Sequence, residues 1–115
     1  MTYIKINETL YPANVYGSMK DRLWDDRESK TIKLAMDYAT AAALFVDGLN
    51  WSIVMDVEQP QEDGSVIIVQ EEYDNSEYDV AGPITDNRNG TVTVKMGKKT
   101  DGEMLAELME VLNND

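Results

Sequence analysis

Apolar and polar residues alternate along much of this chain with the two-residue period of a β-strand. The clearest example is 30–36, where Ile32, Leu34 and Met36 point one way and the residues between them point the other. The same alternation, or a short apolar run between turn residues, predicts six further strands. These strands cover 2–6, 10–16, 50–57, 65–72, 78–85 and 91–96.

Turn residues connect the predicted strands. The strongest signal is Asn87-Arg88-Asn89-Gly90, in which Gly90 suits the left-handed position of a bulged hairpin. The segment 59–64 contains Pro, Gly and two acids, so it joins its neighbouring strands into a hairpin with a long acidic tip.

Pro12 suggests where one strand lies in the sheet. Because proline donates no backbone hydrogen bond, we expect 10–16 to be an edge strand. The polar segment 17–26 that follows is expected to be irregular and to tuck Leu23 and Trp24 inward.

The first predicted helix covers 38–46, with Asp37 as its N-cap and Asp47-Gly48 as its stop. It is apolar nearly all round, which is typical of a helix that is buried on several faces or that docks a partner. Its apolar residues are Ala39, Ala41, Ala42, Ala43, Leu44, Phe45 and Val46.

A second helix is predicted at the C-terminal end, where Thr100 and Glu103 have the spacing of a capping box. An apolar stripe at helical spacing follows, formed by Met104, Leu105, Leu108, Met109 and Leu112. Such a stripe is most often core, but its narrowness leaves a partner groove or self-association open. The methionines at inward positions of their elements are expected to fill gaps in the core. They are Met36, Met55, Met96, Met104 and Met109.

These elements predict one α+β domain over 1–115: a mostly antiparallel β-sheet or small barrel, with one inserted helix and a C-terminal amphipathic helix.

Charge is distributed very unevenly. The formal net charge is -12, and 34–87 holds twelve acids and no basic residue, whereas the rest of the chain is neutral. This balance argues against direct nucleic-acid binding and against anionic membrane surfaces, because both need clustered Lys and Arg. It favours a basic protein partner, a cation, or simply solubility.

Ten residues form the candidate partner-binding surface, an acidic row with tyrosines between the carboxylates on the predicted hairpin and the loop after it. They are Glu58, Glu62, Asp63, Glu71, Glu72, Asp74, Glu77, Asp79, Tyr73 and Tyr78. The alternative interpretation is a well-solvated surface that prevents association.

Catalytic and metal-binding chemistry has little support. The chain has no His and no Cys, which removes the commonest general base, metal ligands and the thiol nucleophile. The acids of 72–79 are suitable calcium ligands, but their spacing does not fit an EF-hand loop. Asp25 and Asp26 could be paired carboxylates, although Trp24 anchoring a loop and Arg27 pairing with a local acid explains this stretch better. We therefore expect no enzyme activity, no cofactor and no metal.

Several stretches resemble small proteins encoded in tailed phages and prophages of gut Firmicutes. They are 2–12, 24–30, 44–48, 51–54 and 77–97. The resemblance covers most of the chain, and its motifs are structural, with no catalytic residues to carry over. Because similar proteins are encoded near tail genes, it implies a tail-associated or assembly role.

The leading hypothesis is therefore a non-enzymatic phage protein that acts through protein–protein contacts, docking through the strand 10–16 and the helix 38–46. The alternative is an anti-defence inhibitor, such as an anti-CRISPR protein, whose acids mimic DNA in the basic channel of a nuclease. A homo-oligomer is compatible with the leading hypothesis. The chain shows no signal peptide and no membrane span, so we expect it in the host cytoplasm or the virion.

Overall fold

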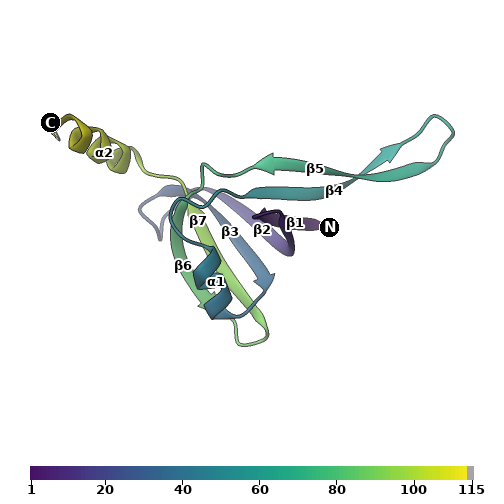
Figure 1. Ribbon diagram of the computed structural model, residues 1–115, viewed down its shortest axis with the longest axis horizontal. Coiled ribbons are helices and arrows are strands. Elements are labelled where there is room, and N and C mark those ends of the chain that lie inside the picture. The colour runs from purple at the N-terminus through teal and green to yellow at the C-terminus, as the bar shows by residue number, and fades with distance from the viewer. Residues whose placement is uncertain (114–115) are drawn as a thin grey trace.

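The computed structural model describes residues 1–113, which form seven strands and two helices (Figure 1). The elements are β1 (Thr2–Ile6), β2 (Thr9–Asp21), β3 (Arg27–Ala35), α1 (Tyr38–Leu44), β4 (Ser52–Pro60), β5 (Val66–Asp74), β6 (Val80–Asp86), β7 (Thr91–Gly97) and α2 (Asp101–Asn113). All strand pairs are antiparallel, in the order β5-β4-β1-β2-β3-β7-β6. The α+β prediction is confirmed, and the sheet is open rather than closed into a barrel.

β2 lies inside the sheet, so the prediction of an edge strand at 10–16 was wrong. It also extends to Asp21, well into the segment expected to be irregular. β2 pairs with β1 through Thr9–Pro12 and with β3 from Ala13 onward. Pro12 therefore has a strand neighbour on one side only, and a position without an N–H donor is tolerated there.

The core lies on one face of the sheet, where alternate residues of several strands meet. β3 and β7 supply the pattern expected from sequence: Ile32, Val92, Val94 and Met96 are completely buried. The Asn87–Gly90 turn joins β6 to β7, and Gly90 has the positive φ that was expected.

α1 packs against β6 and β7 (Figure 1). Its N-cap is confirmed, because Thr40 N donates to Asp37 Oδ1 at 2.7 Å. Only one side of this helix region reaches the core, through Ala41 and Phe45, whereas Tyr38 is half exposed. The apolar composition therefore reflects small alanines on the solvent side rather than burial on several faces.

β4 and β5 form the expected hairpin, which projects from the body as a long arm (Figure 1). β1 pairs with β4 only through Ser52–Met55, so the outer part of the arm is a two-stranded ribbon.

α2 projects from the opposite end of the molecule (Figure 1), and none of its described residues is buried. The expectation that its stripe is core was therefore wrong. The methionine prediction holds for the buried Met96 and the partly buried Met36, but it fails for Met55, Met104 and Met109, which are exposed. Leu23 is also exposed, contrary to expectation, whereas Trp24 is partly buried.

Candidate interaction site

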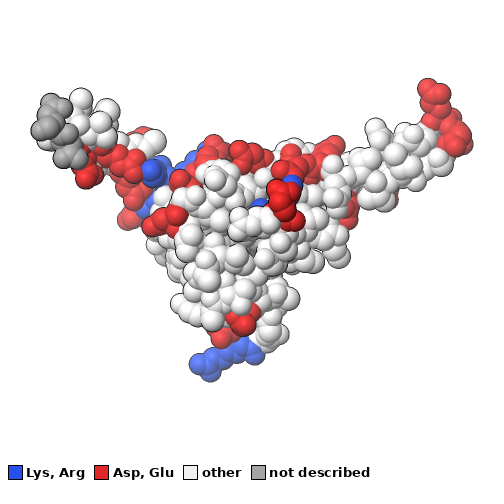
Figure 2. Space-filling view, in the orientation of Figure 1, with Lys and Arg blue, Asp and Glu red and all other residues white. Residues whose placement is uncertain are grey.

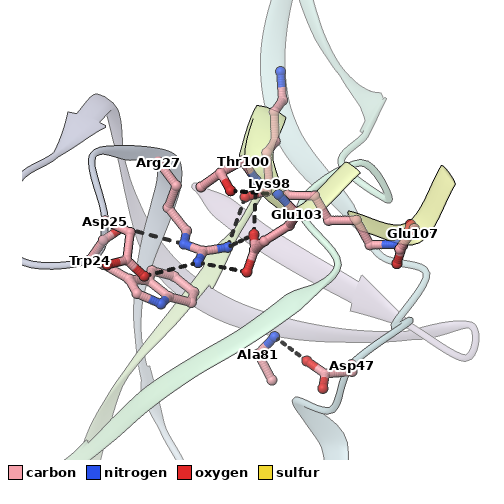
Figure 3. A network of polar contacts seen from close by, with 10 residues as sticks. Trp24, Asp25, Arg27, Asp47, Ala81, Lys98, Thr100, Glu103 and Glu107 are labelled. Carbon is pink, nitrogen blue, oxygen red and sulfur yellow. Dashed lines mark hydrogen bonds and ion pairs between the residues drawn. The ribbon is translucent and has the colours of Figure 1, made fainter. Parts of the chain in front are cut away.

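Arg27 anchors α2 to the body of the protein. Its Nη1 donates to Glu103 Oε1 at 2.8 Å and its Nη2 donates to Glu103 Oε2 at 3.1 Å, a two-pronged contact drawn in Figure 3. Nη1 also donates to the carbonyl oxygen of Lys98 at 3.1 Å. The Arg27 side chain is buried, so this charge-assisted contact is partly shielded from water.

Trp24 supports this arginine. The guanidinium of Arg27 lies 4.5 Å from the centroid of the Trp24 ring, a cation–π distance. The outer edge of the indole packs closely on Gly82 and Gly97, where an added Cβ would come within 2.6 and 2.8 Å of ring atoms. Asp25, which lies between Trp24 and Arg27 in the sequence, has a positive φ, and its Oδ2 lies 3.5 Å from Arg27 Nη2. Trp24 thus anchors its loop, and Arg27 pairs with a local acid as expected.

Two further contacts lie on the same side of α2 as the Arg27–Glu103 ion pair and join the start of the helix to the residues just before it. The capping box is confirmed, because Thr100 N donates to Glu103 Oε1 and Glu103 N donates to Thr100 Oγ1. One turn later, Lys99 Nζ donates to Glu107 Oε1 at 2.6 Å. The hydrogen bonds from Arg27, followed by the one from Thr100 N, lower the pKa of Glu103. The acidic side of α2 therefore faces inward.

The cleft between α2 and the body confirms this orientation. It encloses about 600 Å³ and is bordered on the α2 side by Glu103, Ala106 and Glu107. The opposite wall carries Asp47 and Asp79, and Asp47 accepts a hydrogen bond from Ala81 N (Figure 3). Charged side chains gather where α2 meets the body in Figure 2. At 3.6 residues per turn, the apolar stripe lies on the opposite side of the helix.

The stripe is consequently open to solvent. Its residues, together with Val111, are 49 to 70% exposed. Soluble proteins normally turn the apolar side of a helix toward the core. Here charge pairing holds the polar side against the body, so the apolar side is available for contact with another molecule.

The arm formed by β4 and β5 is the second apolar projection. Val66 and Ile68 are exposed on one of its faces, and Ile67 and Met55 are exposed on the other. On the face seen in Figure 2, the stretch of the arm just before its tip carries no charge, and acids gather at the tip. β5 is also an edge strand, so its outward backbone groups have no strand partner within the described chain.

The ten residues of the candidate acidic surface do not lie on one face. Strand register places Glu58, Glu72 and Asp74 on one face of the arm and Glu71 and Tyr73 on the other. The turn of the arm carries Glu62 and Asp63, and the loop before β6 carries Glu77 and Asp79.

Tyr78 is not part of any exposed row, because it is a core residue. Its hydroxyl donates to Glu28 Oε2 at 2.8 Å. Burial, followed by this hydrogen bond, raises the pKa of Tyr78 to about 12. Sequence reasoning placed it with the acids because its neighbours Glu77 and Asp79 are polar.

Among residues 1–113, no three acids are arranged to hold a metal ion, and no helix is long and apolar enough to cross a membrane. No protein-family model, curated protein or solved structure matches this chain.

Proposed function

We propose that this protein acts without catalysis, through contacts with other proteins. The observation that carries the proposal is the outward-facing apolar stripe of α2. The five side chains of the stripe, and Val111 beside it, are exposed because the ion pair of Arg27 with Glu103 holds the acidic side of the helix inward. A contiguous apolar surface of this kind is typical of an interaction site.

The assembly in which these contacts serve is proposed to be a phage tail or its assembly machinery. Support comes from the sequence resemblance and from the shape, in which two apolar elements project from opposite ends of a sheet (Figure 1). The test is mass spectrometry of purified virions of the encoding phage. Stoichiometric amounts of the protein in the particle would support a structural role, and its complete absence would sink that role.

A second candidate function is inhibition of a nuclease through acidic mimicry of DNA. It is supported by acids that form no ion pair with another described residue, including Glu58, Glu62 and Asp63 on the arm. Against it stands the distribution of the acids over both faces of the arm.

This alternative makes a distinct prediction. Replacement of Glu58, Glu62 and Asp63, which are unpaired among the described residues, by Lys should abolish inhibition of the nuclease without unfolding the protein. Glu72 and Glu77 are paired with Lys5 and Lys98 and are left unchanged. Binding should also weaken steeply as salt rises, because exposed charges are screened beyond about 8 Å at physiological ionic strength. Inhibition that survives both changes would rule out mimicry.

A further inference from the structure

We propose that the apolar stripe of α2 is the contact through which two copies of this chain pair as a symmetric dimer. This inference rests on the proposed function and names one partner for it, a second copy of the same chain. It requires that the stripe be accessible, that it be free of repelling charge, and that it be large enough.

Accessibility follows from how α2 is held. Glu103 reaches the body by its ion pair with Arg27, and Glu107, on the same side of the helix, pairs with Lys99 in the link between β7 and α2. Leu105, Met109 and Leu112 lie on the side directly opposite these glutamates. α2 buries none of its described residues, so a second molecule can reach the stripe without displacing any part of the fold.

The charges on α2 allow two copies to meet at the stripe, and the stripe offers few unpaired acids to a basic protein. The two glutamates nearest the body are already neutralised within their own molecule, on the side away from the stripe. Two stripes can therefore meet antiparallel without bringing those acids together. Asp101 lies on the stripe's side one turn before Leu105, and the antiparallel arrangement places the two copies of Asp101 at opposite ends of the contact. A two-fold contact of this kind is self-complementary, since the same patch serves on both copies.

The arm is less suited to self-pairing. Glu58, Glu62 and Asp63 lie at or next to its tip and form no ion pair within residues 1–113. Antiparallel pairing of two β5 edges along the run Val66–Val69 would place the tip acids of one copy near Glu71 and Glu72 of the other. Like charges would oppose that contact.

The size of the stripe sets the expected affinity. The five residues of the stripe and Val111 at its margin together expose on the order of 600 Å² per copy, below the roughly 800 Å² per partner of a stable specific interface. A pair of single helices cannot bury all of this area, so we expect a dissociation constant in the micromolar range. Each copy carries a net charge of -12, so moderate salt should strengthen the dimer by screening the repulsion.

The experiment is the absolute mass of the full chain by sedimentation equilibrium, from about 1 to 200 µM, at low and moderate salt. We expect a monomer–dimer equilibrium that salt shifts toward the dimer. The double variant Leu105→Gln, Leu112→Gln keeps good helix formers and should weaken the dimer by roughly 100-fold or more. The matched control Ile68→Gln removes an equally exposed apolar side chain from the arm and should leave the dimer unchanged.

The absence of cysteine in the chain allows a second test. Leu108 is the midpoint of the stripe, so Leu108→Cys should form an intermolecular disulfide under mild oxidation. Ala106→Cys, on the side that lines the inner cleft, should not.

A monomer at every concentration, or a dimer that the double leucine variant leaves intact, would overturn the proposal. Neither result would affect the virion experiment, so the broader proposed function would stand or fall separately.

Discussion

Glu103→Gln tests whether charge pairing, rather than apolar packing, holds α2 against the body. Glutamine still fits the capping box, so the start of the helix is preserved while the carboxylate that binds Arg27 is lost. Hydrogen bonds to charged groups contribute about 1.5–3 kcal/mol when buried, and exposed ion pairs contribute about 0–1 kcal/mol. Glu103 is 45% exposed and Arg27 is buried, so we expect a loss of about 1–2 kcal/mol.

This loss corresponds to a roughly 5- to 30-fold fall in the ratio of docked to undocked α2. Because α2 buries none of its described residues, the effect should be local. Amide hydrogen exchange should therefore accelerate in α2 and remain unchanged in β7. The midpoint of global thermal unfolding should move little.

The matched control is Glu110→Gln. It makes the same chemical change on the same helix, at a glutamate that forms no ion pair with a described residue. Its exchange rates should equal those of the unchanged protein. Equal acceleration in both variants, or loss of protection throughout the sheet, would refute the reasoning.

The same ion pair makes docking depend on pH. Hydrogen bonds from Arg27 lower the pKa of Glu103 in the folded protein below its ordinary value of 4.5. Docking energy from this group is therefore complete above pH 4.5 and is lost as the pH falls through the lowered pKa. Exchange in α2, corrected for the intrinsic pH effect, should accelerate in that acidic window, and it should not do so in Glu103→Gln.

Three further predictions concern the body and the arm. Gly97→Ala should lower the free energy of unfolding by about 1–3 kcal/mol, measured by urea titration, because the new methyl group collides with Arg27 and Trp24. On α2, the methyl group of Gly102→Ala meets Thr100 Oγ1 at an ordinary contact distance of 3.9 Å, so this change should instead protect the helix from exchange. The fold favours the neutral form of Tyr78, so the free energy of unfolding should fall as the pH rises from 10 toward 12. An unfolding midpoint that does not change with pH across that range would contradict the raised pKa of Tyr78. Ile68→Thr should change the free energy of unfolding by less than about 0.5 kcal/mol, because this arm residue is 62% exposed; a larger loss in the urea titration would place it in the core.

The sequence predicted strands and helix caps correctly where the pattern depends only on residues close together in the chain. Ile32 and Leu34 on β3, and Val92, Val94 and Met96 on β7, alternate cleanly and are buried as expected. Asp37 and Thr100 are helix caps whose partners lie three residues away, so sequence spacing was sufficient to find them.

Prediction failed where the answer depended on distant neighbours. Pro12 excludes a hydrogen bond, but sequence does not show that β2 changes partners at that residue. The stripe of α2 reveals an apolar side without revealing which side faces the body. That orientation depends on Arg27 and Glu103, which are 76 residues apart, and no local signal links them.

The candidate acidic surface shows the same limit. Composition located the acids on the arm correctly, but strand alternation sends neighbouring carboxylates such as Glu71 and Glu72 to opposite faces. Tyr78 has polar neighbours in sequence and yet lies in the core, because its ring packs there while its hydroxyl reaches Glu28.

The change of partners within β2 has a consequence for how the chain tolerates insertions. Tyr11, Ala13 and Val15 all pack toward the core, the first on the β1 side of the change and the other two on the β3 side. One residue inserted after Pro12 would leave the first half of the sheet in place and turn every later side chain of β2 to the wrong face. The irregular pairing between Ser18 and Asp21, in contrast, is where β2 already accommodates such a mismatch. We therefore expect β2 to tolerate an inserted residue between Ser18 and Asp21 but not in its middle.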